Sequence, residues 1–157
     1  MLKRTGWAAA AIGLIASAWA CWGRHGDFEG TWARVGLLDS SISLREAEDG
    51  FHFRWKLNDG DKLISCTRDD FCEEFRDGDR VYEYHFRLDG PPGSSEIIVR
   101  CDGRPVVSEM EPVSWVDRIV LHDGGRELWS YLVEMNGEKM EPPVGPIRFV
   151  RVAETPF

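Results

Sequence analysis

The stretch FHFRWKLNDG, residues 51–60, shows the pattern that decides the fold. Apolar residues occupy every second position from Phe51 to Leu57 and alternate with His52, Arg54 and Lys56. A period of two with one apolar face is typical of an antiparallel strand that covers a core on one side. The stretch ends in an Asp-Gly pair, which tolerates the positive φ angles of a tight hairpin turn. The sequence therefore predicts a strand that leads directly into a hairpin.

The same combination of alternating segment and turn recurs along the chain. Seven Asp-Gly or Asn-Gly pairs follow one another at intervals of a strand plus a turn, and we predict hairpin turns at most of them: Asp49-Gly50, Asp59-Gly60, Asp77-Gly78, Asp89-Gly90, Asp102-Gly103, Asp123-Gly124 and Asn136-Gly137. Two further segments also alternate, and we expect their interior faces to carry Tyr82, Tyr84, Phe86 and Leu88 in one and Trp129, Tyr131, Val133 and Met135 in the other.

An all-β chain of about ten strands follows from this pattern. We place strand starts near Thr31, Ile42, Phe51, Lys62, Glu73, Arg80, Glu96, Arg104, Ser114, Glu127 and Ile147, one of which is a bulge or loop. The stretches GPPGSS (90–95) and EPPVGP (141–146) are expected to be rigid connections, and a short helical turn is possible at residues 69–74. Sequential hairpins favour an antiparallel up-and-down barrel of about 8–10 strands over a two-sheet sandwich, which needs longer crossovers.

The N-terminal segment predicts export. Lys3 and Arg4 precede the apolar run TGWAAAAIGLIASAWA (5–20), the layout of a signal peptide. The run is shorter than the roughly 20 apolar residues that a spanning helix needs, although an uncleaved N-terminal anchor is the alternative. We therefore divide the chain into a signal peptide (1–20), a short tether (21–29) and a barrel domain (30–153).

Two modes of cleavage fit the same bond. Ala18-Trp19-Ala20 is an A-x-A site for ordinary signal peptidase, and AWAC (18–21) resembles a degenerate bacterial lipobox. We favour lipidation of Cys21, because a cysteine at that bond is otherwise unexplained. Trp22 rather than Asp follows, which fits tethering to the outer membrane on its periplasmic side. A soluble secreted protein is the alternative.

The net charge restricts the class of partner. Loss of residues 1–20 removes two of the 19 basic residues and none of the 27 acidic ones, which gives a net charge of −10. Nucleic acids and anionic lipid surfaces require basic patches, so we expect neither as a partner, apart from a membrane anchor through lipid.

Cys66 and Cys72 bracket a loop of five residues and are predicted to form a disulfide in an oxidising compartment. Cys101 is then free, or paired with Cys21.

Gly30-Thr31-Trp32, in the first predicted strand, is similar to the G-x-W signature of the calycins, the group of lipocalins and fatty-acid-binding proteins. Residues 117–139 also look like the hairpins of small secreted bacterial lipocalin-like domains. The resemblance implies that Trp32 plugs one end of a barrel and that a basic residue of the last strand, Arg148 or Arg151, packs on its ring. We assign Trp32 and Arg151 to this plug.

Function is the least constrained part of the prediction. We expect aromatic side chains to share the barrel interior, which is either a packed core or a ligand cavity lined by aromatic rings with polar tips. The candidate ligand-binding residues are Trp55, Tyr82, Tyr84, Trp129, Tyr131 and Arg148. The first hypothesis is thus a monomeric, non-catalytic envelope protein that binds a small apolar or amphipathic molecule. A filled barrel that contacts an envelope partner is the alternative.

The sequence offers no positive sign of catalysis, metal or cofactor. It has no G-x-S-x-G motif and no glycine-rich phosphate loop after a strand. The spacing of Cys66 and Cys72 is not a zinc pattern, and the acidic run at 69–79 lacks the spacing of an EF-hand. His52 and His85 fall on the less apolar faces of their strands, so we expect solvent exposure for both. We predict neither catalytic residues nor a bound cofactor.

Overall fold

Antiparallel strands fill almost all of the described chain. The computed structural model describes residues 28–91 and 93–153, so the predicted signal peptide and Cys21 lie outside the described residues. The elements are β1 (Gly30–Arg34), β2 (Ser40–Ala47), β3 (Gly50–Asp59), β4 (Lys62–Arg68), β5 (Phe71–Arg76), β6 (Asp79–Asp89), β7 (Glu96–Pro105), β8 (Val113–His122), a 3-10 turn η1 (Asp123–Gly125), β9 (Glu127–Met135) and β10 (Glu138–Ala153). No α-helix occurs in this part of the chain.

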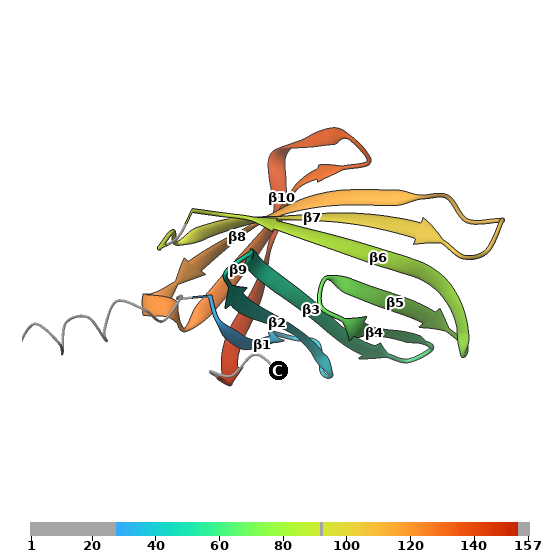
Figure 1. Cartoon of the computed structure of the whole chain (residues 1–157), viewed down its shortest axis with the longest axis horizontal. Coiled ribbons are helices and arrows are strands. Elements are labelled where there is room, and N and C mark those ends of the chain that lie inside the picture. Colours follow the sequence, from blue (N-terminus) through green and yellow to red (C-terminus); the bar gives the residue numbers. More distant parts are fainter. Residues whose placement is uncertain (1–27, 92, 154–157) are drawn as a thin grey trace, which may run out of the picture.

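The strands close into one barrel. Each strand pairs with the next along the chain, and β10 pairs with β1 to complete the ring (Figure 1). The predicted antiparallel up-and-down barrel is therefore confirmed, with ten strands. The helical turn considered possible at 69–74 does not form, because β5 begins at Phe71.

Six of the seven Asp-Gly or Asn-Gly pairs lie at connections between strands. Asp77 and Asn136 have φ angles of 50° and 49°, as tight turns require. Asp102-Gly103 instead lies inside β7, and the separate strand expected at Arg104 is part of β7. A Cβ on Gly103 would come within 2.8 Å of the Tyr84 ring, so this glycine makes room for packing and does not form a turn.

The prediction that the last strand begins near Ile147 is wrong. β10 already begins at Glu138 and includes the proline-containing stretch 141–146 that we expected to be a connection. Its register against β9 shifts between Lys139 and Val144 and again between Val144 and Ile147. Prolines donate no N–H to a ladder, and such irregular positions are where strands accommodate them.

The β4–β5 hairpin pairs with β3 over only a short part of its length. β3 pairs with β4 only through Leu57, Asn58 and Asp59, at the end of the strand. Farther back along β3, the turn residue Asp70 replaces the missing ladder: its N–H donates to the Phe53 carbonyl at 2.9 Å, and the Phe86 N–H donates to the Asp70 carbonyl at 2.9 Å. In Figure 1 the green β4–β5 hairpin lies between β3 and β6. One turn thus connects β3 to β6 and closes the wall.

Trp32 is fully buried at one end of the barrel. Its indole N–H donates to the Phe28 carbonyl at 3.1 Å. Of the two arginines considered for the plug, Arg151 is the one over this ring: its Cζ is 4.3 Å from the ring centroid, and its Nη1 donates to the Glu29 carbonyl at 3.1 Å. A guanidinium at that distance is attracted by the negative face of the indole.

Candidate functional site

The barrel interior holds a cavity of about 520 Å³. Its mouth is formed by residues at and beside the β1–β2 and β3–β4 turns, and its floor by apolar side chains. The mouth residues are Arg34, Leu37, Asp59 and Lys62, and the floor residues are Phe53, Phe86, Val99, Ile119 and Phe149. The barrel is therefore not packed solid.

One wall of the cavity is aromatic. Trp55 on β3, Tyr84 and Phe86 on β6, and Trp115 on β8 contact one another with ring centroids 5.5–6.5 Å apart. Most of these contacts are edge-to-face, a geometry that aromatic pairs favour. Trp115 was not among the predicted site residues, although alternation in β8 places it on one face with Asp117 and Ile119.

The predicted ligand-binding residues fall into three groups, in the cavity lining, in the packed core beside the cavity and on the outer face. Trp55 and Tyr84 line the cavity. Tyr82 is only 6% exposed, but its hydroxyl donates to the Glu111 carbonyl at 2.7 Å, and it is part of the packed core beside the cavity.

Trp129, Tyr131 and Arg148 lie on the outer face, so the prediction that both aromatic rings share the interior is wrong. Trp129 stacks on His122 with centroids 4.0 Å apart, and Tyr131 packs under Arg118. The reason is the register of β9 with β10, which pairs the inward Leu128 with the buried Phe149. Ser130 and Leu132, on the same face of β9 as Leu128, line the cavity.

Arg148 pairs with Trp129 across the strands and points outward with it. Its side chain is 47% exposed and contacts Glu127 at 2.8 Å. The structure thus places this predicted ligand contact in a surface ion pair, away from the cavity lining.

A buried carboxylate supports the aromatic wall. Glu74 on β5 has no exposed surface; it accepts hydrogen bonds from the Tyr84 hydroxyl and from Arg76 Nε at 2.7 Å, and Lys62 Nζ lies 3.4 Å away. Burial acts to raise the pKa of Glu74, but the bonds from Tyr84 and Arg76 and the nearby positive charges outweigh it and lower that pKa. Burial and Glu74 also raise the pKa of Tyr84, which stays protonated and donates. The sequence pattern gave no sign of this pair.

Asp117 is the second acid of the interior. It lines the cavity on β8 and accepts a hydrogen bond from the Trp115 indole N–H at 3.1 Å. Burial raises the pKa of Asp117 to about 6, against the opposing effect of that hydrogen bond. Asp117 forms no ion pair with a described residue. The cavity therefore contains an uncompensated carboxyl group.

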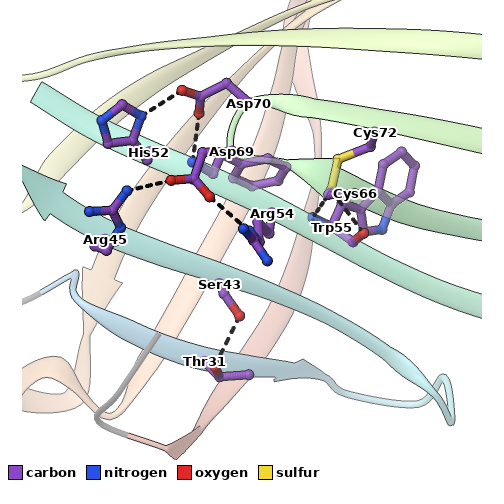
Figure 2. A network of polar contacts seen from close by, with 11 residues as sticks. Thr31, Ser43, Arg45, His52, Arg54, Trp55, Cys66, Asp69, Asp70 and Cys72 are labelled. Carbon is purple, nitrogen blue, oxygen red and sulfur yellow. Dashed lines mark hydrogen bonds and ion pairs between the residues drawn. A yellow bond between two sulfur atoms is a disulfide. The ribbon is translucent and has the colours of Figure 1, made fainter. Parts of the chain in front are cut away.

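A polar network on the outer face fixes the β4–β5 turn (Figure 2). Asp69 accepts from Arg54 Nε at 2.8 Å and also contacts Arg45. The His52 ring lies between Asp70, at 2.6 Å, and Asp49, at 2.9 Å. Hydrogen bonds to these two carboxylates raise the pKa of His52. His52 is on the outer face as expected, but both of its ring nitrogens are hydrogen-bonded to carboxylates and are not simply exposed to solvent.

The predicted Cys66–Cys72 disulfide is confirmed, and it links β4 to β5 beside Trp55. The Trp55 N–H donates to Cys66 Sγ at 3.0 Å, so the bridge supports the strand that carries a wall residue (Figure 2). Cys101 has a free, buried thiol, and burial raises its pKa well above the ordinary value.

Within residues 28–91 and 93–153, no three His, Cys, Asp or Glu side chains are grouped to hold a metal ion. Over the same ranges, no helix has the length and apolar character to cross a membrane.

The chain matches no family model, no curated protein and no solved structure. The closed meander of ten antiparallel strands is compatible with the calycin architecture.

Proposed function

We propose that this protein binds a small apolar or amphipathic molecule inside its barrel and is not an enzyme. The observation that carries the proposal is the cavity of about 520 Å³, with an apolar floor, an aromatic wall and a polar mouth. Small-molecule sites typically enclose about 300–1,000 Å³ and combine an apolar lining with a few polar groups. Trp55, Tyr84 and Trp115 are the aromatic contacts for such a ligand.

We further propose a calycin-like relationship and a place in the cell envelope. Gly30-Thr31-Trp32 and the position of Arg151 over Trp32 support the first. The Cys66–Cys72 disulfide fits an oxidising compartment, which supports export. Mass spectrometry of the mature N-terminus tests the lipid anchor: a diacyl or triacyl Cys21 supports it, and an unmodified Cys21 or an intact Met1 contradicts it.

Fluorescence of a lipophilic probe tests the binding function. N-phenyl-1-naphthylamine should become brighter on addition of the purified protein, and decanol should reverse the increase by competition. An unchanged probe signal over a broad panel of lipophilic probes would contradict binding and favour a barrel that acts through its outer surface.

A matched pair of variants locates the probe. Ser130 lines the cavity, so Ser130→Phe fills part of it and should weaken binding by about ten-fold or more. Ser41 alternates with the buried Ser40 and Ile42 and so lies on the outer face of β2, where Ser41→Phe should leave binding unchanged. Equal effects of the two substitutions would show that the probe binds elsewhere.

A further inference from the structure

Asp117 is directed into the cavity by its place in β8. It pairs in register with Val99, a residue of the cavity floor that is almost fully buried. The register between β8 and β9 shifts between Val116 and Asp117, beside the carboxyl group. Trp115 lies two positions earlier on the same face, where its indole both contacts Asp117 and packs against Trp55 and Tyr84. The carboxyl group therefore adjoins the aromatic wall.

The hydrogen-bonding capacity of Asp117 is mostly unused. An ionised carboxylate offers about four acceptor sites, and the Trp115 N–H takes one of them. The basic groups of the cavity, Arg34 and Lys62, belong to the mouth, and Lys62 is already 3.4 Å from Glu74. Burying a carboxylate away from water is unfavourable unless a partner compensates its charge. Asp117 is partly buried and forms no ion pair with a described residue, so a cationic hydrogen-bond donor inside the cavity would compensate its charge.

We propose that the ligand is an amphipathic amine, whose apolar body packs on the cavity floor while its protonated nitrogen donates to the Asp117 carboxylate. The inference rests on the proposed binding function and narrows its ligand class. The charge-assisted hydrogen bond supplies the missing compensation. The faces of Trp55, Trp115 and Tyr84 add favourable sites for an organic cation in the same space.

Three ligands with the same ten-carbon chain separate charge from hydrophobicity: decylamine, decanol and decanoate. We expect calorimetry of the purified protein at neutral pH to show decylamine binding about ten-fold or more tighter than decanol, and decanoate binding most weakly. Equal affinity for decylamine and decanol would overturn the inference while leaving the binding function intact. No binding of any of the three would overturn both.

Substitution of Asp117 tests whether its carboxylate causes the preference for decylamine over decanol. In Asp117→Asn, the affinity for decylamine should fall about ten-fold and that for decanol should stay the same. Asp77→Asn removes a carboxylate in the exposed turn between β5 and β6, outside the cavity, and should retain the preference for the amine. A preference that survives in Asp117→Asn overturns the assignment.

The pH dependence of the unmodified protein provides a test that needs no variant. The preference for decylamine over decanol should decline as the pH falls through about 6, where Asp117 takes up a proton. The other titratable groups that line the cavity are Arg34, Asp59, Lys62 and Tyr84, and Cys101 lies close enough for Asp117 to affect its pKa. A preference that stays constant between pH 7 and pH 5, about one unit on either side of that midpoint, would contradict the role of Asp117.

Discussion

Asp70 and Phe53 are joined by two hydrogen bonds that satisfy both backbone polar groups of Phe53. The Asp70 N–H donates to the Phe53 carbonyl at 2.9 Å, and the Phe53 N–H donates to Asp70 Oδ1 at 2.7 Å. A turn residue thereby takes the place of a neighbouring strand at the point where β3 no longer pairs with β4. Phe53 belongs to the cavity floor, so this contact also fixes part of the candidate site.

Removal of the Asp70 carboxylate should destabilise the barrel. Asp70 has a φ of 61°, which glycine adopts without strain, so Asp70→Gly removes the side-chain bonds and keeps the turn. We expect a loss of about 1–3 kcal/mol in the free energy of unfolding, because the Phe53 N–H loses its acceptor. Urea denaturation measures this loss.

Asp77 offers the matched control, since it has a φ of 50° in an exposed turn between β5 and β6. Asp77→Gly should change the free energy of unfolding by no more than about 0.5 kcal/mol. If both substitutions had the same effect, the cause would be backbone conformation and not the bond to Phe53.

His52 should make the stability of the barrel fall as the pH rises. Hydrogen bonds to Asp70 and Asp49 raise its folded-state pKa above the ordinary value of 6.5. The imidazolium thus stabilises the folded state fully below about pH 6.5, and this contribution is lost as the pH rises through the folded-state pKa. The measurement is urea denaturation over a pH series from 6 upward, the region at and above His52's ordinary pKa of about 6.5.

His52→Gln should flatten this part of the pH profile. His85 packs on the Phe71 ring, and His85→Gln should leave the decline in place. A decline that is unchanged in His52→Gln would assign it to another group.

The sequence predicted the barrel because most strands carry charge on one face only. In β3, His52, Arg54 and Lys56 identify the outer side, so Phe53 and Trp55 could be placed inside. In β9 both faces are apolar, and the larger rings of Trp129 and Tyr131 suggested the wrong one. Only the pairing with β10 decides between the two faces, and that pairing is a long-range property that alternation within one strand does not contain.

Polar contacts of the site were harder to predict for the same reason. Glu74 and Tyr84 are ten positions apart and meet because β5 and β6 are neighbours, with Glu74 opposite Tyr82 in the ladder. In the sequence, Glu74 is one of many acids around hairpin turns. Gly103 likewise looked like a turn residue, whereas its lack of a side chain serves the Tyr84 ring on the adjacent strand.

Two arginines over two tryptophans allow a direct comparison of buried and exposed cation–π contacts. Arg151→Met keeps an apolar stem over Trp32 but removes the charge and the bond to the Glu29 carbonyl. We expect a loss of about 1–3 kcal/mol in the free energy of unfolding. Arg148→Met removes an exposed contact with Trp129 and Glu127 and should cost less than about 1 kcal/mol. Thermal or urea denaturation of both variants measures the two losses. An equal loss would show that the buried contact of Arg151 with Trp32 stabilises the barrel no more than an exposed surface contact does.

Asp117 should make the unliganded barrel less stable as the pH rises from about 4 to 6. Burial raises its folded-state pKa from the ordinary 3.8 to about 6, so the folded state binds the proton more tightly than the unfolded chain does. The folded state is therefore favoured by protonated Asp117 below about pH 4, and this advantage, up to about 3 kcal/mol, is lost once the pH exceeds the folded-state pKa. In a pH series of urea denaturations, Asp117→Asn should remove this contribution, so that between pH 4 and pH 6 its stability changes more favourably with rising pH than that of the unmodified protein. Asp59→Asn, at the cavity mouth, should retain the contribution of Asp117. A bound amine should oppose this loss of stability, because it compensates the charge of the Asp117 carboxylate once the proton has left. Saturating decylamine should therefore raise the free energy of unfolding more at pH 7 than at pH 5. These values lie about one unit above and below the folded-state pKa of Asp117. A stabilisation that is the same at both pH values would separate amine binding from the ionisation of Asp117.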